Sequence, residues 1–329
     1  MAFIRTVLGD IRPEELGVCD AHEHLIRSGG EEVRQDPDYL MDSVEAAKRE
    51  FEYWLKAGGK SMVCMDPIGC GRNVPKMLEI AEAFRGRGHI IMATGFHKAV
   101  FYDTRTHWLN TVKDIDKIVE MMVAEIEVGM DKHSYNGPIV ERVEAKAGVI
   151  KAGTSYGLID KFELKALQVA ALTQKRTGCP ISVHTERGTM AYEVAQYLGE
   201  FGADLSHVII CHVQKNPNKY YHKKVLQTGV NICYDGPDRV KYFPDSIHAE
   251  NIRWLVEEGF QKQILLSMDA GRASYQRGYM EIKGKNALGV AYLLERFVPL
   301  LREVGVPDDA INDMLINNPA RVFTFIENR

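Results

Sequence analysis

The chain has 329 residues, of which 45% are hydrophobic and 26% are charged, and its net charge is −4. This is the composition of an ordinary globular protein, and the mildly acidic balance gives no reason to expect nucleic acid or an anionic membrane as a partner. No apolar run reaches the roughly 18 residues that cross a bilayer, and the N-terminus has no basic-then-apolar signal, so we expect a cytoplasmic protein.

The first predicted element is a small hairpin or cap in FIRTVLGDIRPEELG, residues 3–17. Eight short apolar runs follow, and each is too short for a buried helix but suits a strand. The six cysteines are scattered without a CxxC pair, which predicts buried, reduced thiols. In chain order the eight runs are LGVCDAHEHL, SMVCMDP, HIIMATGFH, AGVIKAGTS, PISVHTE, SHVIICHV, VNICYDG and QILLSMDAG.

Longer amphipathic stretches separate these runs, such as DSVEAAKREFEYWLKAGG and ELKALQVAALTQKRTG. Several of them end in glycine, which commonly stops a helix. Strands that are apolar on both faces and alternate with helices indicate a parallel sheet covered by helices. Eight such units predict one closed (β/α)8 TIM barrel as a single domain over residues 1–329, with a doubly wound open sheet as the alternative.

Ionisable side chains stand at the carboxyl ends of the predicted strands, where barrels of this type carry their chemistry. His22 and His24 are two residues apart, so in a strand both imidazoles point to one face and Glu23 points to the other. Each histidine alone is more typical of hydrogen-bonded structure than of a ligand. Five strand ends together bring six side chains to one mouth, namely His22, His24, Lys151, His184, His212 and Asp269.

Four histidines and an aspartate suit Zn²⁺ or a similar divalent ion such as Mn²⁺ or Co²⁺. Lys151 fits less well, because an ammonium repels a metal cation, and the simpler interpretation is a salt bridge to a nearby acid. A desolvated amine, however, becomes neutral more easily and can then add carbon dioxide. The resulting carbamate, with Lys151 as N6-carboxylysine, has the charge and the two oxygens needed to bridge two divalent ions.

In these motifs the chain resembles the phosphotriesterase-homology family of the amidohydrolase superfamily over essentially its whole length. The segments that carry the resemblance are TVLGDI, LGVCDAHEHL, AGVIKAGTS, ISVHTERG, VIICHV, ILLSMDAG and NNPARVF. The resemblance implies two metal sites and names their ligands. These are His22, His24 and Asp269 for the more buried metal, His184 and His212 for the more exposed one, and carboxylated Lys151 as the bridge.

The resemblance also implies a hydrolytic mechanism. A hydroxide that bridges two metals has a lowered pKa and attacks the substrate. The more exposed metal polarises the scissile carbonyl or phosphoryl oxygen. Asp269 is then the catalytic residue that takes the proton of the hydroxide and passes it to the leaving oxygen.

Two predicted loops, DGPDRVKYFPDS and DAGRASYQRGYM, follow strands seven and eight, where barrels often bind phosphate. Lys241 lies in the first loop, and Arg272 and Tyr275 lie in the second. An ammonium, a guanidinium and a phenol suit a dianionic phosphate, although solvated loop charges are the plainer interpretation. KYFPDS and GRASY also resemble the branch of the family that hydrolyses phosphorylated sugar lactones, which implies that these three residues bind the phosphate.

We therefore expect a binuclear-metal lactonase that opens phosphorylated pentono-1,4-lactones, with a small-molecule substrate. One alternative is an esterase, a phosphotriesterase or an acyl-homoserine lactonase on the same metal centre, whose uncharged substrates need apolar pockets. A non-catalytic metal-bound barrel is less favoured, because a receptor needs no proton shuttle such as Asp269. A homodimer is a further open prediction.

Three other polar residues follow predicted strands. His97 and Lys98, after the third strand, are candidate substrate contacts, although a structural role is the simpler interpretation for each. Asp66 ends the second strand, and its role is open between assisting the site and capping a helix.

Overall fold

The computed structural model describes residues 2–102 and 107–326. Its central sheet has eight parallel strands in the order β10-β9-β8-β7-β6-β5-β4-β3. Each strand coincides with one predicted run, and sequential neighbours pair throughout, so the barrel prediction is confirmed and the doubly wound alternative is wrong. The strands are β3 Cys19–Glu23, β4 Ser61–Cys64, β5 His89–Gly95, β6 Val149–Thr154, β7 Ile181–Thr185, β8 Val208–Cys211, β9 Asn231–Asp235 and β10 Ile264–Ser267.

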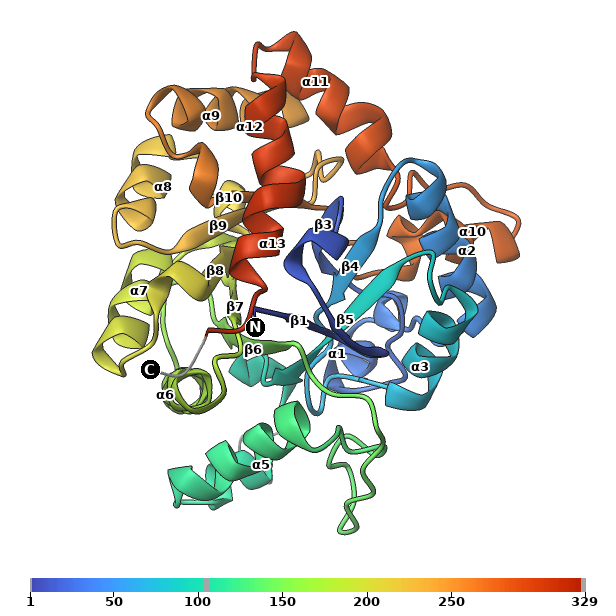
Figure 1. The fold of residues 1–329 in the computed structure, drawn as a ribbon, viewed down its shortest axis with the longest axis vertical. Helices are drawn as coiled ribbons and strands as arrows, with labels where there is room; N and C mark the ends of the chain where they lie inside the picture. The colour runs from blue at the N-terminus through green and yellow to red at the C-terminus, as the bar shows by residue number, and fades with distance from the viewer. Residues whose placement is uncertain (1, 103–106, 327–329) are drawn as a thin grey trace.

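The first and last strands of the sheet meet. Directly beyond β10, the backbone N–H of Asp269 donates to the carbonyl of His22 in β3 at 3.1 Å. This contact joins the two edges of the sheet, so that the strands surround a common centre with the helices outside them (Figure 1). A side chain at the end of any strand therefore faces the same mouth.

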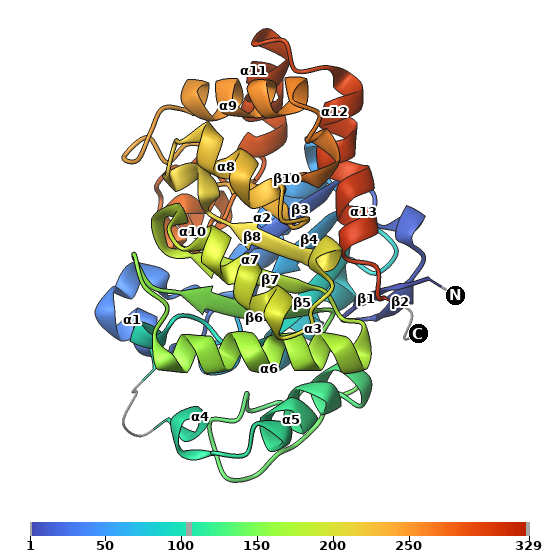
Figure 2. The same cartoon turned by 90° about the vertical axis from the view of Figure 1, so that its left-hand side faces the viewer.

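Helices cover the outer face of the barrel (Figures 1 and 2). None of them, among the described residues, combines the length and the apolar composition needed to cross a bilayer. The α-helices are α1 Glu31–Gln35, α2 Val44–Lys56, α3 Val74–Ala83, α4 Trp108–Thr111, α5 Ile115–Glu127, α6 Lys161–Thr177, α7 Ala191–Glu200, α8 Lys219–Leu226, α9 Asp245–Glu257, α10 Arg277–Ile282, α11 Val298–Glu303, α12 Asp308–Asn312 and α13 Asn318–Val322.

Local signals set the ends of the main helices. The Ser43 hydroxyl accepts the N–H of Ala46 at the start of α2, which satisfies a donor that the helix leaves free. Asp160 and Glu163 form a reciprocal capping box at the start of α6, and Gly178 ends that helix with a φ of 74°. These signals position the helices that follow β3 and β6.

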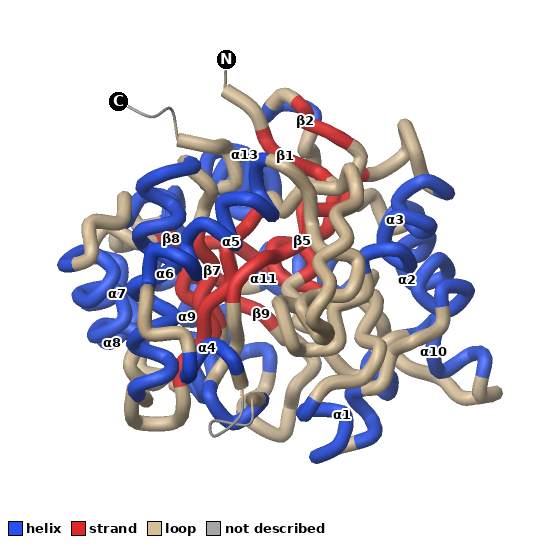
Figure 3. Tube along the Cα trace, turned by 90° about the horizontal axis from the view of Figure 1, so that it is seen from below, coloured by secondary structure: helices blue, strands red, loops and turns tan. Residues whose placement is uncertain are grey.

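The two ends of the barrel differ in chemistry. At one end, β1 (Ile4–Thr6) and β2 (Gly9–Ile11) form an antiparallel hairpin near both chain termini (Figure 3). The buried side chains of this hairpin and of α13 join an apolar cluster with the barrel interior, including Ile4, Val149 and Val322. The six cysteines are all buried and unpaired, as predicted. The opposite end, where α1 lies (Figure 3), is polar and carries the candidate site.

Candidate metal centre

His22 and His24 point to one side of β3, as the period of a strand predicts. Both rings are buried, with centroids 5.6 Å apart. Asp269 approaches them from beyond β10, with Oδ1 lying 3.8 Å from Nε2 of His22 and 3.5 Å from Nε2 of His24. These three residues offer ligand atoms close enough to share one metal ion.

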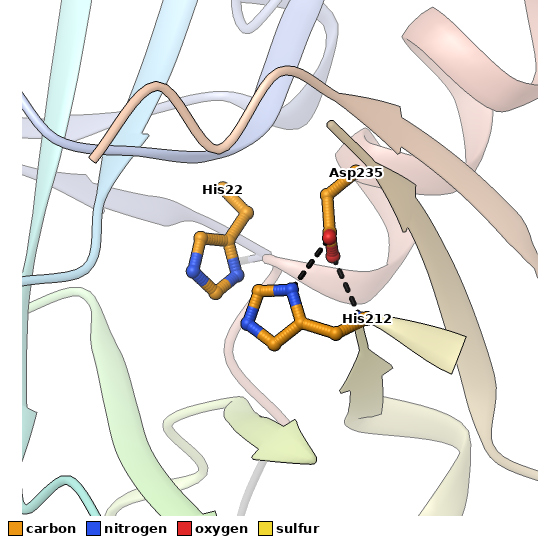
Figure 4. A group of neighbouring side chains, drawn as sticks. All are labelled: His22, His212 and Asp235. Carbon is orange, nitrogen blue, oxygen red and sulfur yellow. Dashed lines mark hydrogen bonds and ion pairs between the residues drawn. The ribbon is translucent and has the colours of Figure 1, made fainter. Parts of the chain in front are cut away.

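His212, directly after β8, forms a second group with His22 and Asp235 (Figure 4). Nδ1 of His212 lies 2.5 Å from Oδ1 of Asp235, and the backbone N–H of His212 donates to Oδ2 at 2.8 Å. Asp235 thereby fixes both the backbone and the ring of His212, whose φ of 67° is in the left-handed region. With Nδ1 engaged by the carboxylate, Nε2 of His212 is free to act as a ligand.

Lys151 is buried in the barrel, with Nζ 3.2 Å from Nε2 of His22. Its position inside β6 differs from the expected strand end, because β6 continues through Thr154. Burial lowers the pKa of the Lys151 amine, so the neutral form becomes more accessible. A buried amine beside an imidazole fits carbamate formation better than the alternative salt bridge to an acid.

His184 lies beside the cluster, but its contacts differ from those of the other histidines. Its ring packs edge-on against His212, with centroids 4.4 Å apart. Nε2 of His184 faces Oε2 of Glu186 at 3.1 Å, and Glu186 in turn pairs with Lys98. His184 can bind a metal ion through Nε2 only after its contact with the Glu186 carboxylate is broken.

The protonation states suit metal binding. Burial and the neighbouring Lys151 hold the pKa of His22 well below its ordinary value, so the ring is neutral at neutral pH. Burial alone would raise the pKa of Asp269, but His212 and Lys215 lower it well below its usual range. Asp66 and Asp269 raise the pKa of His24 despite its burial, so a metal ion bound there would displace a proton. Imidazoles and an ionised carboxylate are the donor set of a borderline divalent ion, so the residues fit the group that the sequence predicts.

Sequence reasoning missed Asp235 and left Asp66 undecided. Asp66 lies 2.9 Å from Nδ1 of His24 through Oδ2, and its Oδ1 accepts the Nε–H of Arg27 at 2.7 Å. The role of Asp66 is thus to orient a histidine of the site, since Asn73 caps the helix that follows β4. The signal for both acids was their place directly at or after the carboxyl end of a strand.

A cavity of about 130 Å³ opens above this cluster. The residues expected to bind phosphate all line it, and Nζ of Lys241 donates to the Tyr275 hydroxyl at 2.9 Å. The Arg239 guanidinium stacks on the Tyr275 ring at 3.7 Å, and Lys215 lies 3.5 Å from Asp269. One wall of the cavity is therefore strongly cationic.

Arg272 reaches the same cavity from the loop after β10. Its guanidinium pairs with Asp36 and lies 3.7 Å from Asp38, and it also stacks on the Tyr39 ring at 4.0 Å. Arg272 therefore joins the loop after β10 to the segment around η2 (Pro37–Tyr39). These partners are 233 or more positions away in the chain, and no motif in the sequence indicates the contacts.

The two candidate contacts after β5 also line the cavity. His97 is buried, with its ring 4.5 Å from that of His184. Lys98 pairs with Glu186 and lies 4.8 Å above the Phe101 ring. Both residues thus combine structural contacts with access to the cavity.

Comparison with known proteins agrees with this geometry. The model of the phosphotriesterase family matches residues 2–323. A phospho-furanose lactonase of Mycoplasmopsis synoviae is 56% identical over 329 residues, 99% of this chain and 93% of the relative. A crystal structure of an amidohydrolase from Mycoplasma synoviae superposes with a TM-score of 0.98 at 56% identity, over 100% of this chain and 93% of that one.

A lactonase from Listeria monocytogenes superposes with a TM-score of 0.89 at 31% identity, over 99% of this chain and 100% of that structure. Family match, sequence identity and fold therefore agree along almost the full chain. The eight-stranded barrel is the common framework. The chain belongs to the phosphotriesterase family.

Proposed function

We propose that the protein is a binuclear-metal-dependent lactonase that opens phosphorylated furanose lactones, the pentono-1,4-lactones. The observation that carries this proposal is a single cavity that joins a metal-type cluster to a cationic wall. Lys241, Tyr275 and Arg272 present an ammonium, a phenol and a guanidinium to the cavity that His22 and Asp269 also line. A substrate with a scissile carbonyl near one end and a phosphate at the other matches both features.

The comparisons support the same substrate class. The relative from Mycoplasmopsis synoviae is named for activity on phospho-furanose lactones, and it shares more than half of its residues with this chain. We extend its substrate class to this protein because the two chains match over almost their full lengths. A cytoplasmic location and a homodimer stay predictions.

We propose the metal ligands that the family resemblance implies. Two divalent ions, Zn²⁺ or else Mn²⁺ or Co²⁺, would supply Lewis acidity and a nucleophilic hydroxide at neutral pH. One group around His22 supplies the ligands of the first ion. From the other group the assignment takes only His212, because Asp235 orients its ring, and it adds His184 after this residue exchanges Glu186. The proposed ligands are His22, His24 and Asp269 for one ion, His184 and His212 for the other, and carboxylated Lys151 between them.

The chain's own groups then have distinct tasks. The Asp269 carboxylate, held ionised by its cationic neighbours, accepts a proton and passes it to the leaving ring oxygen. Lys241, Tyr275 and Arg272 hold the phosphate away from the reacting bond. Binding energy at this remote group orients the lactone carbonyl over the cluster and so contributes to turnover.

An esterase or phosphotriesterase on the same cluster is the alternative. Uncharged substrates of that kind favour apolar walls, whereas this cavity is lined by several cations. Metal-loaded protein should be assayed on phosphorylated lactones, the same lactones without phosphate, and an aryl phosphotriester. We expect the phosphorylated lactones to give the highest kcat/KM. Equal or higher values on the phosphotriester would contradict the proposal.

A further inference from the structure

Glu32 in α1 is a buried carboxylate that the proposed mechanism leaves unused. The residue is 1% exposed, and neither carboxylate oxygen has a hydrogen-bond partner among the described residues. An unpartnered buried carboxylate is costly, so its presence calls for a ligand or a functional role. Glu32 also lines the cavity above the metal cluster, which places this residue beside any molecule bound there.

The nearest cation does not satisfy Glu32. Nε of Arg27 lies 3.5 Å from Oε1 of Glu32, but its N–H donates to Asp66 at 2.7 Å. Nη1 of Arg27 donates to the carbonyl of Gly271 at 2.8 Å, and Nη2 lies against the His24 ring. The donors of Arg27 thus serve the metal cluster and the loop after β10, and Glu32 is left as an acceptor without a donor.

The surroundings of Glu32 indicate which donor it can receive. Burial raises the pKa of Glu32 to about 7 in spite of Arg27, as expected where compensating donors are missing. A ligand with a cationic group is disfavoured here, because the Arg27 guanidinium already lies beside the Glu32 carboxylate. A neutral hydroxyl group can donate to a carboxylate without adding charge, and the carboxylate can accept from more than one hydroxyl.

We propose that Glu32 is a specificity-determining residue that accepts a hydrogen bond from a ring hydroxyl of the substrate. The inference rests on the proposed function, because the furanose lactones considered there carry ring hydroxyls as well as phosphate. The cationic wall binds the phosphate, and Glu32 selects the hydroxylated ring. A site built to bind a hydroxyl discriminates strongly against the analogue that lacks it, since its own polar group is then left unpaired.

The test compares hydroxylated and deoxy ligands. Wild type, Glu32→Gln and Glu32→Ala are assayed on a 5-phosphorylated pentono-1,4-lactone and on its 2-deoxy and 3-deoxy analogues. Wild type should prefer the fully hydroxylated lactone over at least one deoxy analogue by roughly 10- to 100-fold in kcat/KM. Both variants should lose most of this preference and keep their activity on that deoxy analogue. An unchanged preference in both variants would overturn the proposal.

A matched control and a stability measurement separate this role from a structural one. Glu31→Gln alters the neighbouring position of α1, where the carboxylate pairs with Arg34 instead of facing the cavity, and should leave the preference intact. Because no described residue donates a hydrogen bond to the Glu32 carboxylate, Glu32→Gln and Glu32→Ala should not lower the Tm. A clear loss of Tm in both variants would mean that Glu32 supports the fold, which contradicts the proposal.

A binding experiment separates this inference from the proposed function. Titration calorimetry with a pentitol phosphate and its deoxy analogues needs no hydrolysis. One outcome is that wild type fails to open phosphorylated lactones and still binds the pentitol phosphate more tightly than its deoxy analogues, with a difference that Glu32→Gln removes. In that case the proposed function fails and the role of Glu32 stands. If wild type opens these lactones and Glu32→Gln changes neither preference nor binding, the role of Glu32 is wrong and the function stands.

Discussion

Asp235 at the end of β9 holds His212 at two points, since its carboxylate lies 2.5 Å from Nδ1 of the ring and accepts the backbone N–H at 2.8 Å (Figure 4). The same carboxylate also accepts from the Gln214 amide at 2.9 Å. Three donors on one carboxylate fix the direction of the His212 ring. Ligand histidines held in this way bind metal more tightly because their orientation is set in advance.

Asp235→Asn should therefore weaken metal binding. The amide that replaces one oxygen turns an N–H toward an N–H of His212 or Gln214, so at least one contact is lost. We expect affinity for the ion held by His212 to fall by about 10- to 100-fold, measured by competition with a chromogenic chelator. Asp204→Asn, which changes a helix-capping acid far from the cluster, is the control. Equal affinities in wild type and Asp235→Asn would contradict the role of Asp235.

The elements that sequence could predict are those with local signals. The eight apolar runs predicted the strands, and the regular placement of polar groups at their ends predicted the cluster. His184 and Glu186 are two residues apart, like His22 and His24, so their shared face could have been read from the same period. Strand position marked Asp235, but an acid at a strand end is common and does not reveal which histidine it will contact.

Contacts between distant loops could not be predicted. The pairing of Arg272 with Asp36 depends on closure of the barrel, which brings the loop after β10 beside the segment that follows β3. The unpartnered state of Glu32 likewise depends on Arg27 being engaged by Asp66. Such features follow from three-dimensional packing and have no periodic signature in the chain.

Lys151→Ala should lose metal and activity together, because its carbamate is proposed to bridge the two ions. Elemental analysis of protein prepared with excess metal should give about two ions per chain for wild type and fewer for the variant. Short carboxylic acids added to the variant should restore part of both, since they replace the carbamate oxygens.

Isotope-labelled bicarbonate provides a direct check on Lys151. Wild type should show a carbamate carbonyl signal by NMR that is absent from Lys151→Ala, whereas Lys146→Ala, which changes a lysine outside the cluster, should retain it. Full metal content in Lys151→Ala, or no carbamate signal in active wild type, would rule out carboxylation.

Glu50 should make the stability of the fold depend on pH. Its buried carboxylate accepts the N–H of Gly278 at 2.6 Å and that of Val290 at 2.7 Å, and burial raises its pKa to about 7. Between the ordinary pKa of a glutamate and about 7, Glu50 therefore holds a proton in the folded chain that it releases in the unfolded chain. The contribution of Glu50 to stability is fully present below the unfolded pKa and is lost as pH rises through about 7.

Urea unfolding at pH 5.5 and pH 8 measures this effect. The free energy of unfolding of wild type should fall by on the order of 2 kcal/mol more than that of Glu50→Gln across this interval. Glu45→Gln, on the exposed face of the same helix, should follow wild type. Parallel pH profiles for wild type and Glu50→Gln would show that Glu50 does not titrate in this range.

The phosphate site should be separable from the metal centre. Arg272 and Lys241 line the cavity but are not among the proposed metal ligands, so Arg272→Met and Lys241→Met should retain full metal content. Loss of one partner of a charge-assisted contact costs on the order of 2–5 kcal/mol, which is roughly a 30- to several-thousand-fold loss in kcat/KM. In wild type Arg272 pairs with Asp36, so phosphate binding exchanges one anion for another at this side chain.

The loss should fall on phosphorylated lactones and spare the same lactones without phosphate. Part of it should appear in kcat, because the remote phosphate helps to position the scissile carbonyl. Arg277→Met provides the control, since this arginine lies on the same segment but pairs with Glu281 at the surface. Equal losses on both substrates would assign Arg272 and Lys241 to support of the fold or the metal cluster. No loss on either substrate would identify them as solvated loop charges.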